Sequence, residues 1–336
     1  MSNNSSPVVA VLGCGSWGSA LAILLTNNGA EVRLWGHLPE EIDKLLEEGE
    51  NSSFLPGRPF PPGLTPTTDL AAAVAEADEV VVVVPSHAFR SVLTGVEALL
   101  SPGTSLCWAT KGLDPQSGRL LHEVAAELLG ERPLAVISGP SFAGEVADGQ
   151  PTAVTVASSS LDHANRVARL LHCMTFRAYT SDDVIGLEVG GAAKNVMAIG
   201  AGIADGLGFG ANARAALITR GLAEITRLGL KLGGRTETFM GLGGMGDLVL
   251  TCTDNQSRNR RMGLALAHGL TIDQAKAEIG QEVEGVGTTL EIHNKAQQLA
   301  VEMPITEQIY QVLYQGLDPR KAVEALLCRE NKPEAG

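Results

Sequence analysis

The chain has 336 residues, more than one ordinary hydrophobic core contains, so its length favours two domains. Apolar residues make up 44% and charged residues 19%, which excludes disorder over most of the length. The net charge of −13 argues against non-specific binding to nucleic acid or to a membrane surface. An anionic ligand would therefore need a local basic cluster.

The five cysteines are scattered and never spaced C-x-x-C, which predicts neither a disulfide framework nor a zinc site. The N-terminal segment has no basic stretch, and its apolar run covers only residues 8–12. This pattern is typical of neither a signal peptide nor a membrane span. We expect a cytoplasmic protein with no metal site, no nucleic-acid partner and no membrane insertion.

Short β-branched segments alternate with helical segments through the N-terminal half. A run of five valines at 80–84 is typical of a central strand buried on both faces of a mostly parallel sheet. The alternation predicts a Rossmann-type, doubly wound α/β domain over residues 1–182, with ligands at the carboxyl ends of the strands. The predicted strands are 8–12, 32–35, 79–84, 105–110, 134–137, 153–157 and 176–180, and the predicted helices are 17–28, 88–100, 118–129 and 162–172.

The first predicted strand is followed by a G-x-G-x-x-G turn at Gly13, Gly15 and Gly18, and an apolar helix comes next. In this context the motif predicts a dinucleotide-binding turn. Gly13 allows the tight turn, Gly15 allows a pyrophosphate to approach, and Gly18 allows helix and strand to pack closely. The alternative is a glycine-rich loop without a ligand.

The second predicted strand ends with no carboxylate, although NAD-specific folds usually place one there. His37 and Arg33 could instead attract a 2′-phosphate, so we expect NADPH to be accepted at least as well as NADH. The alternative is that His37 is a solvated loop residue. At the next strand ends, Lys111 is a candidate contact for an anionic cofactor or substrate, and otherwise a solvated lysine.

From residue 183 on, long stretches rich in Ala, Leu and Gly replace the valine-rich strands. We predict helices at 185–204 and 211–230. Capping signals follow at Thr271 with Gln274, and at Asp318 before Pro319. The sequence therefore predicts an all-α domain over residues 183–336.

Lys194 stands out in the first of these helices. Gly190 and Gly191 precede it, and each glycine costs a helix about 1 kcal/mol relative to alanine, which predicts a close approach by another backbone. The helical neighbours of Lys194 are small or apolar, so its ammonium could be desolvated and exchange protons. The alternative is a lysine that extends its head to water.

Three arginines, Arg258, Arg260 and Arg261, form the local basic cluster that an acidic chain needs to bind an anion. Ser257 and Asn259 add neutral donors near a predicted helix start, and arginine can bind a phosphate through two hydrogen bonds. A solvated arginine-rich helix face is the alternative, which suits Arg260 or Arg261 better than Arg258. Asp247, directly after a glycine-rich loop, could orient a lysine or accept a hydrogen bond from a hydroxyl.

Together these segments resemble the bacterial NAD(P)-dependent glycerol-3-phosphate dehydrogenase family of phospholipid synthesis. The resemblance runs from residue 8 to about residue 328. It implies hydride transfer from NADPH or NADH to dihydroxyacetone phosphate, with a proton from Lys194. The matching strings are VLGCGSWGSALA, VVVPSH, WATKGL, ISGPSFAGEVA, GGAAKNVMAIGAGIADGLGFGANARAALITRGLAE, GLGGMGDLVLTCTDNQSRNRR and EMPITEQIYQVLY.

The resemblance also implies site residues. The implied catalytic residue is Lys194. The implied substrate contacts are Lys111, Gly139, Ser141, Lys194, Asp247, Ser257, Arg258 and Asn259. The implied cofactor contacts, besides the glycines of the turn, are Ser16, Trp17, His37, Lys111, Ala143, Arg258, Val283 and Glu284.

Gly287 departs from the family, which usually has a basic or polar residue there. Two alternatives stay open: a related 3-hydroxyacid or 6-phosphogluconate-type dehydrogenase, and a catalytically silent NADPH-sensing module. The sequence does not fix the oligomeric state, and a homodimer is the one assembly we consider. The expected partner is a small phosphate-bearing substrate.

Overall fold

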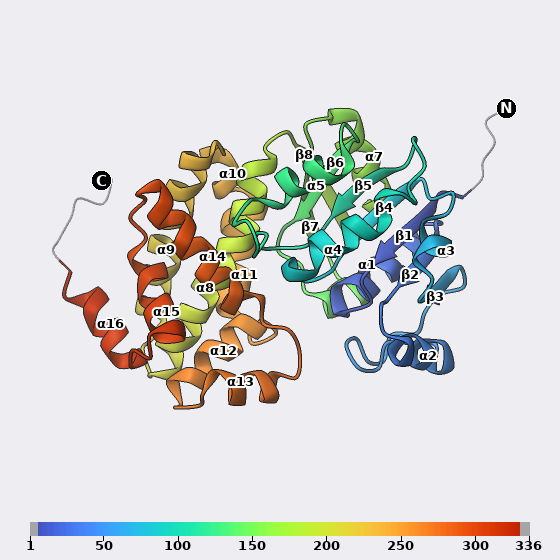
Figure 1. Ribbon diagram of the computed structural model, residues 1–336. Coiled ribbons are helices and arrows are strands. Elements are labelled where there is room, and N and C mark those ends of the chain that lie inside the picture. Colours follow the sequence, from blue (N-terminus) through green and yellow to red (C-terminus); the bar gives the residue numbers. More distant parts are fainter. Residues whose placement is uncertain (1–5, 330–336) are drawn as a thin grey trace. The chain divides into compact units, whose positions relative to one another are not determined.

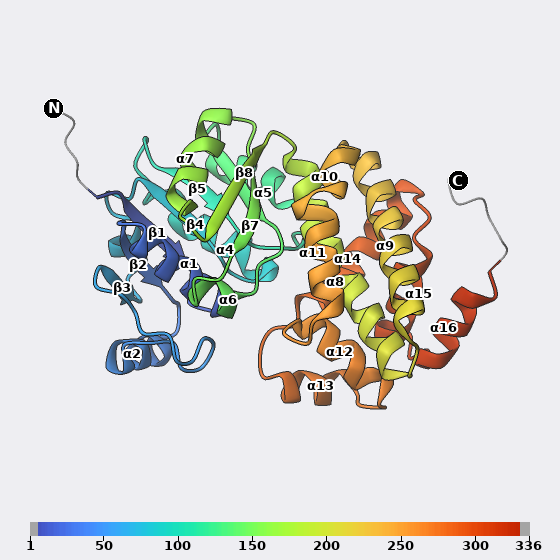
Figure 2. The same cartoon turned by 180° about the vertical axis from the view of Figure 1, so that it is seen from behind.

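The computed structural model describes residues 6–329, and the ends of the predicted domains at 1–5 and 330–336 lie outside this range. The chain divides into two compact units, of which the first ends at Glu188 and the second begins at Val189. The first unit contains strands and helices, and the second contains helices (Figures 1 and 2). The domain boundary that we expect between residues 182 and 183 stays a prediction.

The first unit is an α/β fold in which strands and helices alternate along the chain. Its strands are β1 (Val8–Leu12), β2 (Glu31–Trp35), β3 (Leu64–Thr67), β4 (Glu79–Val82), β5 (Ser105–Trp108), β6 (Leu134–Ser138), β7 (Thr152–Ala157) and β8 (Phe176–Ser181). Its helices are α1 (Ser16–Asn27), α2 (Pro39–Glu48), α3 (Leu70–Val74), α4 (Ser86–Glu97), α5 (Leu121–Leu129), α6 (Ala143–Ala147) and α7 (Leu161–Leu171).

One eight-stranded sheet, in the order β3-β2-β1-β4-β5-β6-β7-β8, organises this unit. The strands from β3 to β6 pair in parallel, and β7 runs antiparallel to β6. Helices α1 and α7 pack on one face of the sheet, and α3, α4 and α5 pack on the other (Figure 1). The predicted doubly wound α/β architecture is confirmed.

The valine run forms the centre of the sheet, as predicted, because β4 lies between β1 and β5 and its valines are buried. The prediction missed β3, a four-residue edge strand that contains Pro66. A proline cannot donate to a ladder and is tolerated at an edge, so this segment has a weak strand signal. Strands β4 and β5 also end two residues earlier than predicted, at Val82 and Trp108.

The regular elements of the second unit, over the residues that the structure describes, are all helical, which confirms the predicted all-α part. The predicted caps are present: Thr271 Oγ1 accepts from Gln274 N, and Asp318 Oδ1 accepts from Arg320 N. The helices are α8 (Val184–Gly206), which begins before the unit boundary, α9 (Ala211–Leu232), α10 (Thr236–Met240), the π-helix η1 (Leu242–Gly246), α11 (Asp247–Thr253), α12 (Arg258–Ala267), α13 (Ile272–Ile279), α14 (Glu284–Leu299), α15 (Pro304–Tyr314) and α16 (Pro319–Leu327).

Helix α8 is the core helix of this unit. Of the described helices, it alone is long and apolar enough to cross a membrane, yet 89% of its apolar stretch is buried inside the protein. It crosses α12 at two glycines: a Cβ on Gly202 would lie 2.1 Å from Arg260 O, and one on Gly263 would lie 2.0 Å from Ile199 O. Only glycine permits the two helix backbones to lie this close. The short distance between α8 and α12 brings polar residues of both helices together.

Glu224, on α9, is a buried carboxylate at the start of α15. Its oxygens accept hydrogen bonds from Ile305 N at 2.7 Å, Thr306 N at 3.2 Å and Thr306 Oγ1 at 3.3 Å. These donors are among those that a helix start leaves unpaired. Burial outweighs them and raises the pKa of Glu224 to about 7.

The raised pKa predicts a specific pH dependence of stability. Between the ordinary value of 4.5 and about 7, the folded state binds more protons at Glu224 than the unfolded state. This group therefore lowers the free energy of unfolding as pH rises through that window. Glu224→Gln keeps a hydrogen-bond acceptor but carries no charge at any pH. The free energy of unfolding of the variant, minus that of wild type, should therefore increase by up to about 3 kcal/mol from pH 5 to pH 8.

Urea unfolding followed by circular dichroism at pH 5, 6, 7 and 8 measures this difference. The matched control is Glu278→Gln, which removes an exposed carboxylate from α13 and should track wild type at each pH. A Glu224→Gln difference that stays constant with pH would contradict the prediction.

Candidate active site

The dinucleotide turn of the first unit has the backbone geometry that each glycine was expected to provide. Gly13 has φ +119°, and a Cβ there would lie 2.4 Å from Val83 O. A Cβ on Gly18 would lie 1.8 Å from Gly13 O, whereas one on Gly15 would meet no atom within 4 Å. A side chain would therefore clash with the backbone at Gly13 and Gly18, whereas the space beside Gly15 is empty. Empty space at the second glycine fits a pyrophosphate at the start of α1.

Asn51 stabilises this turn through hydrogen bonds that no local sequence pattern predicts. Its Nδ2 donates to Cys14 O and to Ser19 Oγ, both at 2.8 Å, and its side chain is buried. Ser16 and Trp17 form the first turn of α1, and both are partly exposed. His37 follows β2 and is exposed.

Lys111, Gly139 and Ser141 come together after the carboxyl ends of β5 and β6. Lys111 Nζ donates to Gly139 O at 3.5 Å, and Ser141 Oγ donates to the same oxygen at 3.1 Å. A Cβ on Gly139 would lie 2.8 Å from Val154 Cα, so this position also has no room for a side chain. Ala143 begins α6 directly afterwards. Residues 28 positions apart thus form one polar edge of the sheet.

In the second unit, Lys194 lies on α8 with its ammonium buried against α11. Lys194 is 7% exposed and Asp247 is 1% exposed. Lys194 Nζ forms an ion pair with Asp247 Oδ1 and donates to Thr251 Oγ1 at 2.8 Å. The Thr251 hydroxyl in turn donates to Asp247 O at 2.6 Å. The lysine does not extend to water, and its charged form is stabilised by a carboxylate.

Close backbone packing places Lys194 beside α11. A Cβ on Gly190 would lie 2.6 Å from Gly243 O in the π-helix η1, so the glycine allows the approach that its presence in a helix led us to expect. The π-helix is followed immediately by Asp247, the first residue of α11. Thr251, one turn further, is a site residue that sequence reasoning missed. Its only signal is the i, i+4 spacing from Asp247.

A chain of amide contacts links α8, α12 and α14. Asn259 Nδ2 donates to Asn195 Oδ1 at 2.9 Å, and Asn259 Oδ1 accepts from Gly285 N at 2.8 Å. Both asparagines are buried. Asn259 is therefore a bridge between helices within the protein.

The three arginines of α12 have different environments. Arg260 is buried and pairs with Asp205 Oδ2 at 2.5 Å and with Asn255 Oδ1 at 3.0 Å, so it is a structural residue. Burial lowers the pKa of the Arg258 guanidinium, the charge of Arg261 acts in the same direction, and the carboxylates of Glu284 and Glu282 oppose both. The Nε of Arg261 is buried and has no hydrogen-bond partner among the described residues. The unpartnered Nε of Arg261 is the donor in this group that an anionic ligand could satisfy.

Ser257 is the N-cap of α12, where its Oγ accepts from Arg260 N at 3.2 Å. Val283 is buried and precedes Glu284, the first residue of α14. Gly287, the position at which the chain departs from the family, is exposed on that helix. The residues expected to form the site thus fall into two groups, one in each unit.

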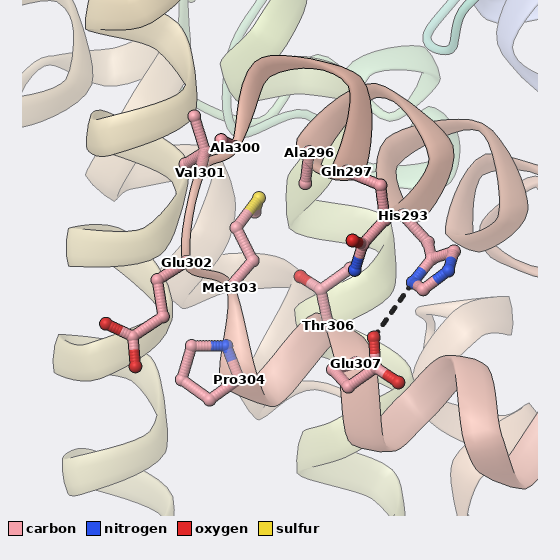
Figure 3. Close-up of a pocket in the computed structure, with 10 residues that line it drawn as sticks. All are labelled: His293, Ala296, Gln297, Ala300, Val301, Glu302, Met303, Pro304, Thr306 and Glu307. Carbon is pink, nitrogen blue, oxygen red and sulfur yellow. Dashed lines mark ion pairs between the residues drawn. The ribbon is translucent and has the colours of Figure 1, made fainter.

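A separate cavity of about 400 Å³ in the second unit contains none of these residues. It lies where α14 ends and α15 begins, and its lining includes His293, whose Nδ1 lies 3.0 Å from Glu307 Oε2 (Figure 3). Within residues 6–329, no group of three or more His, Cys, Asp or Glu side chains is placed to hold a metal ion.

Comparisons with known proteins cover nearly the whole chain. Residues 8–164 match the model of the NAD-dependent glycerol-3-phosphate dehydrogenase N-terminus, and residues 183–324 match that of the C-terminus. A protein named glycerol-3-phosphate dehydrogenase [NAD(P)+] from Aeromonas salmonicida is 58% identical over 328 residues, which are 97% of this chain and 98% of the relative.

Solved structures of glycerol-3-phosphate dehydrogenases are similar to this chain over most of its length. The crystal structure of glycerol-3-phosphate dehydrogenase from Coxiella burnetii is 49% identical with a TM-score of 0.95, and the match covers 96% of this chain and 99% of that one. The glycerol-3-phosphate dehydrogenase of Saccharomyces cerevisiae is 26% identical with a TM-score of 0.81, covering 95% and 99% of the two chains.

Proposed function

From the premise that the chain belongs to the NAD(P)-dependent glycerol-3-phosphate dehydrogenase family, we propose that Lys194 is its proton donor in the reduction of dihydroxyacetone phosphate to sn-glycerol 3-phosphate. The observation that carries the proposal is the buried contact of Lys194 with Asp247 and Thr251. An ammonium held in this way is charged and fixed in direction before the substrate binds.

Lys194 can supply both a proton and a positive charge to the carbonyl oxygen as it becomes an alkoxide. Proton donation by a positioned group is general acid catalysis, and a fixed cation beside a developing oxyanion lowers the barrier further. Asp247 holds the ammonium and compensates its charge within the protein. Thr251 fixes the direction of Nζ by accepting a hydrogen bond from it.

We assign the substrate phosphate to Arg258, with Ser257 and Asn259 at the same helix start. Arg258 is the candidate because Arg260 is already paired with Asp205, whereas Arg258 is buried at the helix start beside Arg261, with the carboxylates of Glu284 and Glu282 near it. A phosphate held here would fix the carbonyl relative to Lys194 and reduce the entropic part of the barrier. Lys111, Gly139, Ser141 and Asp247 complete the proposed substrate contacts.

The turn at Gly13, Gly15 and Gly18 fits a dinucleotide, because only the second glycine has empty space beside it. Ser16, Trp17, His37, Lys111, Ala143, Arg258, Val283 and Glu284 are the other proposed contacts. The nicotinamide supplies the hydride when NADPH or NADH is bound.

We also propose that the enzyme acts in the cytoplasm to supply glycerol phosphate for phospholipids, and that it forms a homodimer.

The family match over both parts of the chain favours this reaction over that of a 3-hydroxyacid or 6-phosphogluconate-type dehydrogenase. A silent NADPH-sensing module is disfavoured by the buried ion pair. Binding alone would not require a lysine and a carboxylate to be desolvated together, which costs free energy.

Replacing Lys194 tests the proton donor. Lys194→Ala should lower kcat by about 10²-fold or more and leave NADPH binding nearly unchanged. Lys194→Arg should also fail, because a guanidinium stays protonated and is larger than the lysine head. Steady-state rates and NADPH fluorescence titrations measure both effects. More than a tenth of wild-type kcat in Lys194→Ala would rule out the assigned role.

Thr251→Val tests the orientation of the lysine, because it removes the hydroxyl and keeps the side-chain shape. We expect a loss in kcat of about tenfold, with a smaller change in KM. Thr253→Val is the matched control, since Thr253 Oγ1 makes the same i−4 contact to Val249 O but is exposed. Equal effects of the two substitutions would mean that Thr251 only stabilises α11.

Arg258→Ala tests phosphate recognition. The variant should raise KM for dihydroxyacetone phosphate about 100-fold and also lower kcat, because phosphate binding positions the carbonyl. Turnover of unphosphorylated dihydroxyacetone should change far less. Equal losses on both substrates would assign Arg258 to another role.

The end of β2 decides the expected cofactor preference. Since β2 ends without a carboxylate, NADPH should support a kcat/KM at least equal to that of NADH. Initial rates with each cofactor at saturating dihydroxyacetone phosphate measure the ratio, and a large preference for NADH would refute the prediction.

A further inference from the structure

A carboxylate that the linear motif does not reveal lies beside the dinucleotide turn. Cys14, inside the G-x-G-x-x-G turn, donates from Sγ to Glu41 Oε2 at 3.7 Å. Glu41 is in the first turn of α2, 27 residues further along the chain. Burial of Cys14, together with the charge of Glu41, raises the pKa of the thiol to about 12.

Glycine at position 36 makes this contact possible. A Cβ on Gly36 would lie 2.5 Å from Cys14 Sγ and 2.9 Å from Ile42 Cδ1. Gly36 is the first residue after β2, and its missing side chain lets α2 fold back against the turn. The end of β2, the turn and the start of α2 therefore form one packed unit.

The charges around the end of β2 favour a role for Glu41. Arg33, which we considered as a partner for a 2′-phosphate, donates to the carbonyl oxygens of Ala72 and Ala75 and to Glu31 Oε1. The Arg33 guanidinium is thus held by hydrogen bonds to carbonyl oxygens at α3. His37 is exposed, and α2 adds two carboxylates, Glu40 and Glu41, in its first turn.

The end of β2 is where dinucleotide folds distinguish their cofactors. A carboxylate there accepts hydrogen bonds from the ribose hydroxyls of NADH and repels the 2′-phosphate of NADPH. In this chain no carboxylate occupies the strand end itself, but the fold brings Glu41 to the turn that follows β1. Glu40, one residue earlier, is exposed, and the partner of Cys14 is Glu41.

We propose that Glu41 limits how strongly this enzyme prefers NADPH, because its charge disfavours the 2′-phosphate near the turn; NADPH is still expected to be accepted at least as well as NADH. The proposal rests on the proposed function, since it assumes that the turn binds NADPH or NADH. Acidic residues also stabilise helix starts, which would explain Glu40 and Glu41 equally well. Only Glu41, however, contacts the turn.

The test compares Glu41→Gln with the matched control Glu40→Gln in the full-length protein. Fluorescence titration gives Kd for NADPH and for NADH, and initial rates with dihydroxyacetone phosphate give kcat/KM for each. Glu41→Gln should improve NADPH binding relative to NADH by about fivefold or more, because it removes one unit charge near the phosphate. Glu40→Gln should leave the ratio unchanged.

An unchanged NADPH-to-NADH ratio of Kd in Glu41→Gln would overturn the proposal, and so would an equal change in Glu40→Gln. Thermal unfolding of both variants checks that α2 is intact, and the double variant Cys14→Ala with Glu41→Gln shows whether the thiol contributes. If wild type binds both cofactors but does not reduce dihydroxyacetone phosphate, the proposed function fails, while the Kd ratios still decide the role of Glu41.

Discussion

The ion pair between Lys194 and Asp247 is the interaction on which the second unit depends. Two opposite charges are almost fully removed from water, so each requires the other. The surrounding structure brings the two charges together. Gly190 lets α8 approach the π-helix η1, and Asp247 follows η1 directly.

The same constraint links stability to chemistry. Glycines at the crossing of α8 and α12 bring Asn195 and Asn259 into contact, and Gly285 N completes the chain of hydrogen bonds. These contacts fix α12, whose first residue is Arg258. The proton donor and the proposed phosphate ligand are therefore positioned by neighbouring parts of one helical framework, which is how the protein can orient a small substrate.

Local patterns made much of the architecture predictable. The G-x-G-x-x-G turn, the valine run and the helix caps depend on residues close in sequence, and the structure confirms the α/β and all-α parts that they predict. Edge strand β3 was missed because four residues with a proline have almost no periodic signal. The site was harder to predict. Asn51 and Glu41 reach the dinucleotide turn across 37 and 27 residues, and Thr251 reaches Lys194 across 57. Pairings over such separations depend on packing that no local pattern specifies.

Chemical rescue of Lys194→Ala tests the central claim most directly, because it separates proton donation from charge. If Lys194 supplies the proton, small primary ammonium ions such as methylammonium should restore turnover of dihydroxyacetone phosphate in a saturable manner. Tetramethylammonium, which carries a charge but no transferable proton, should not. Equal rescue by both cations would contradict the account and reduce Lys194 to an electrostatic role.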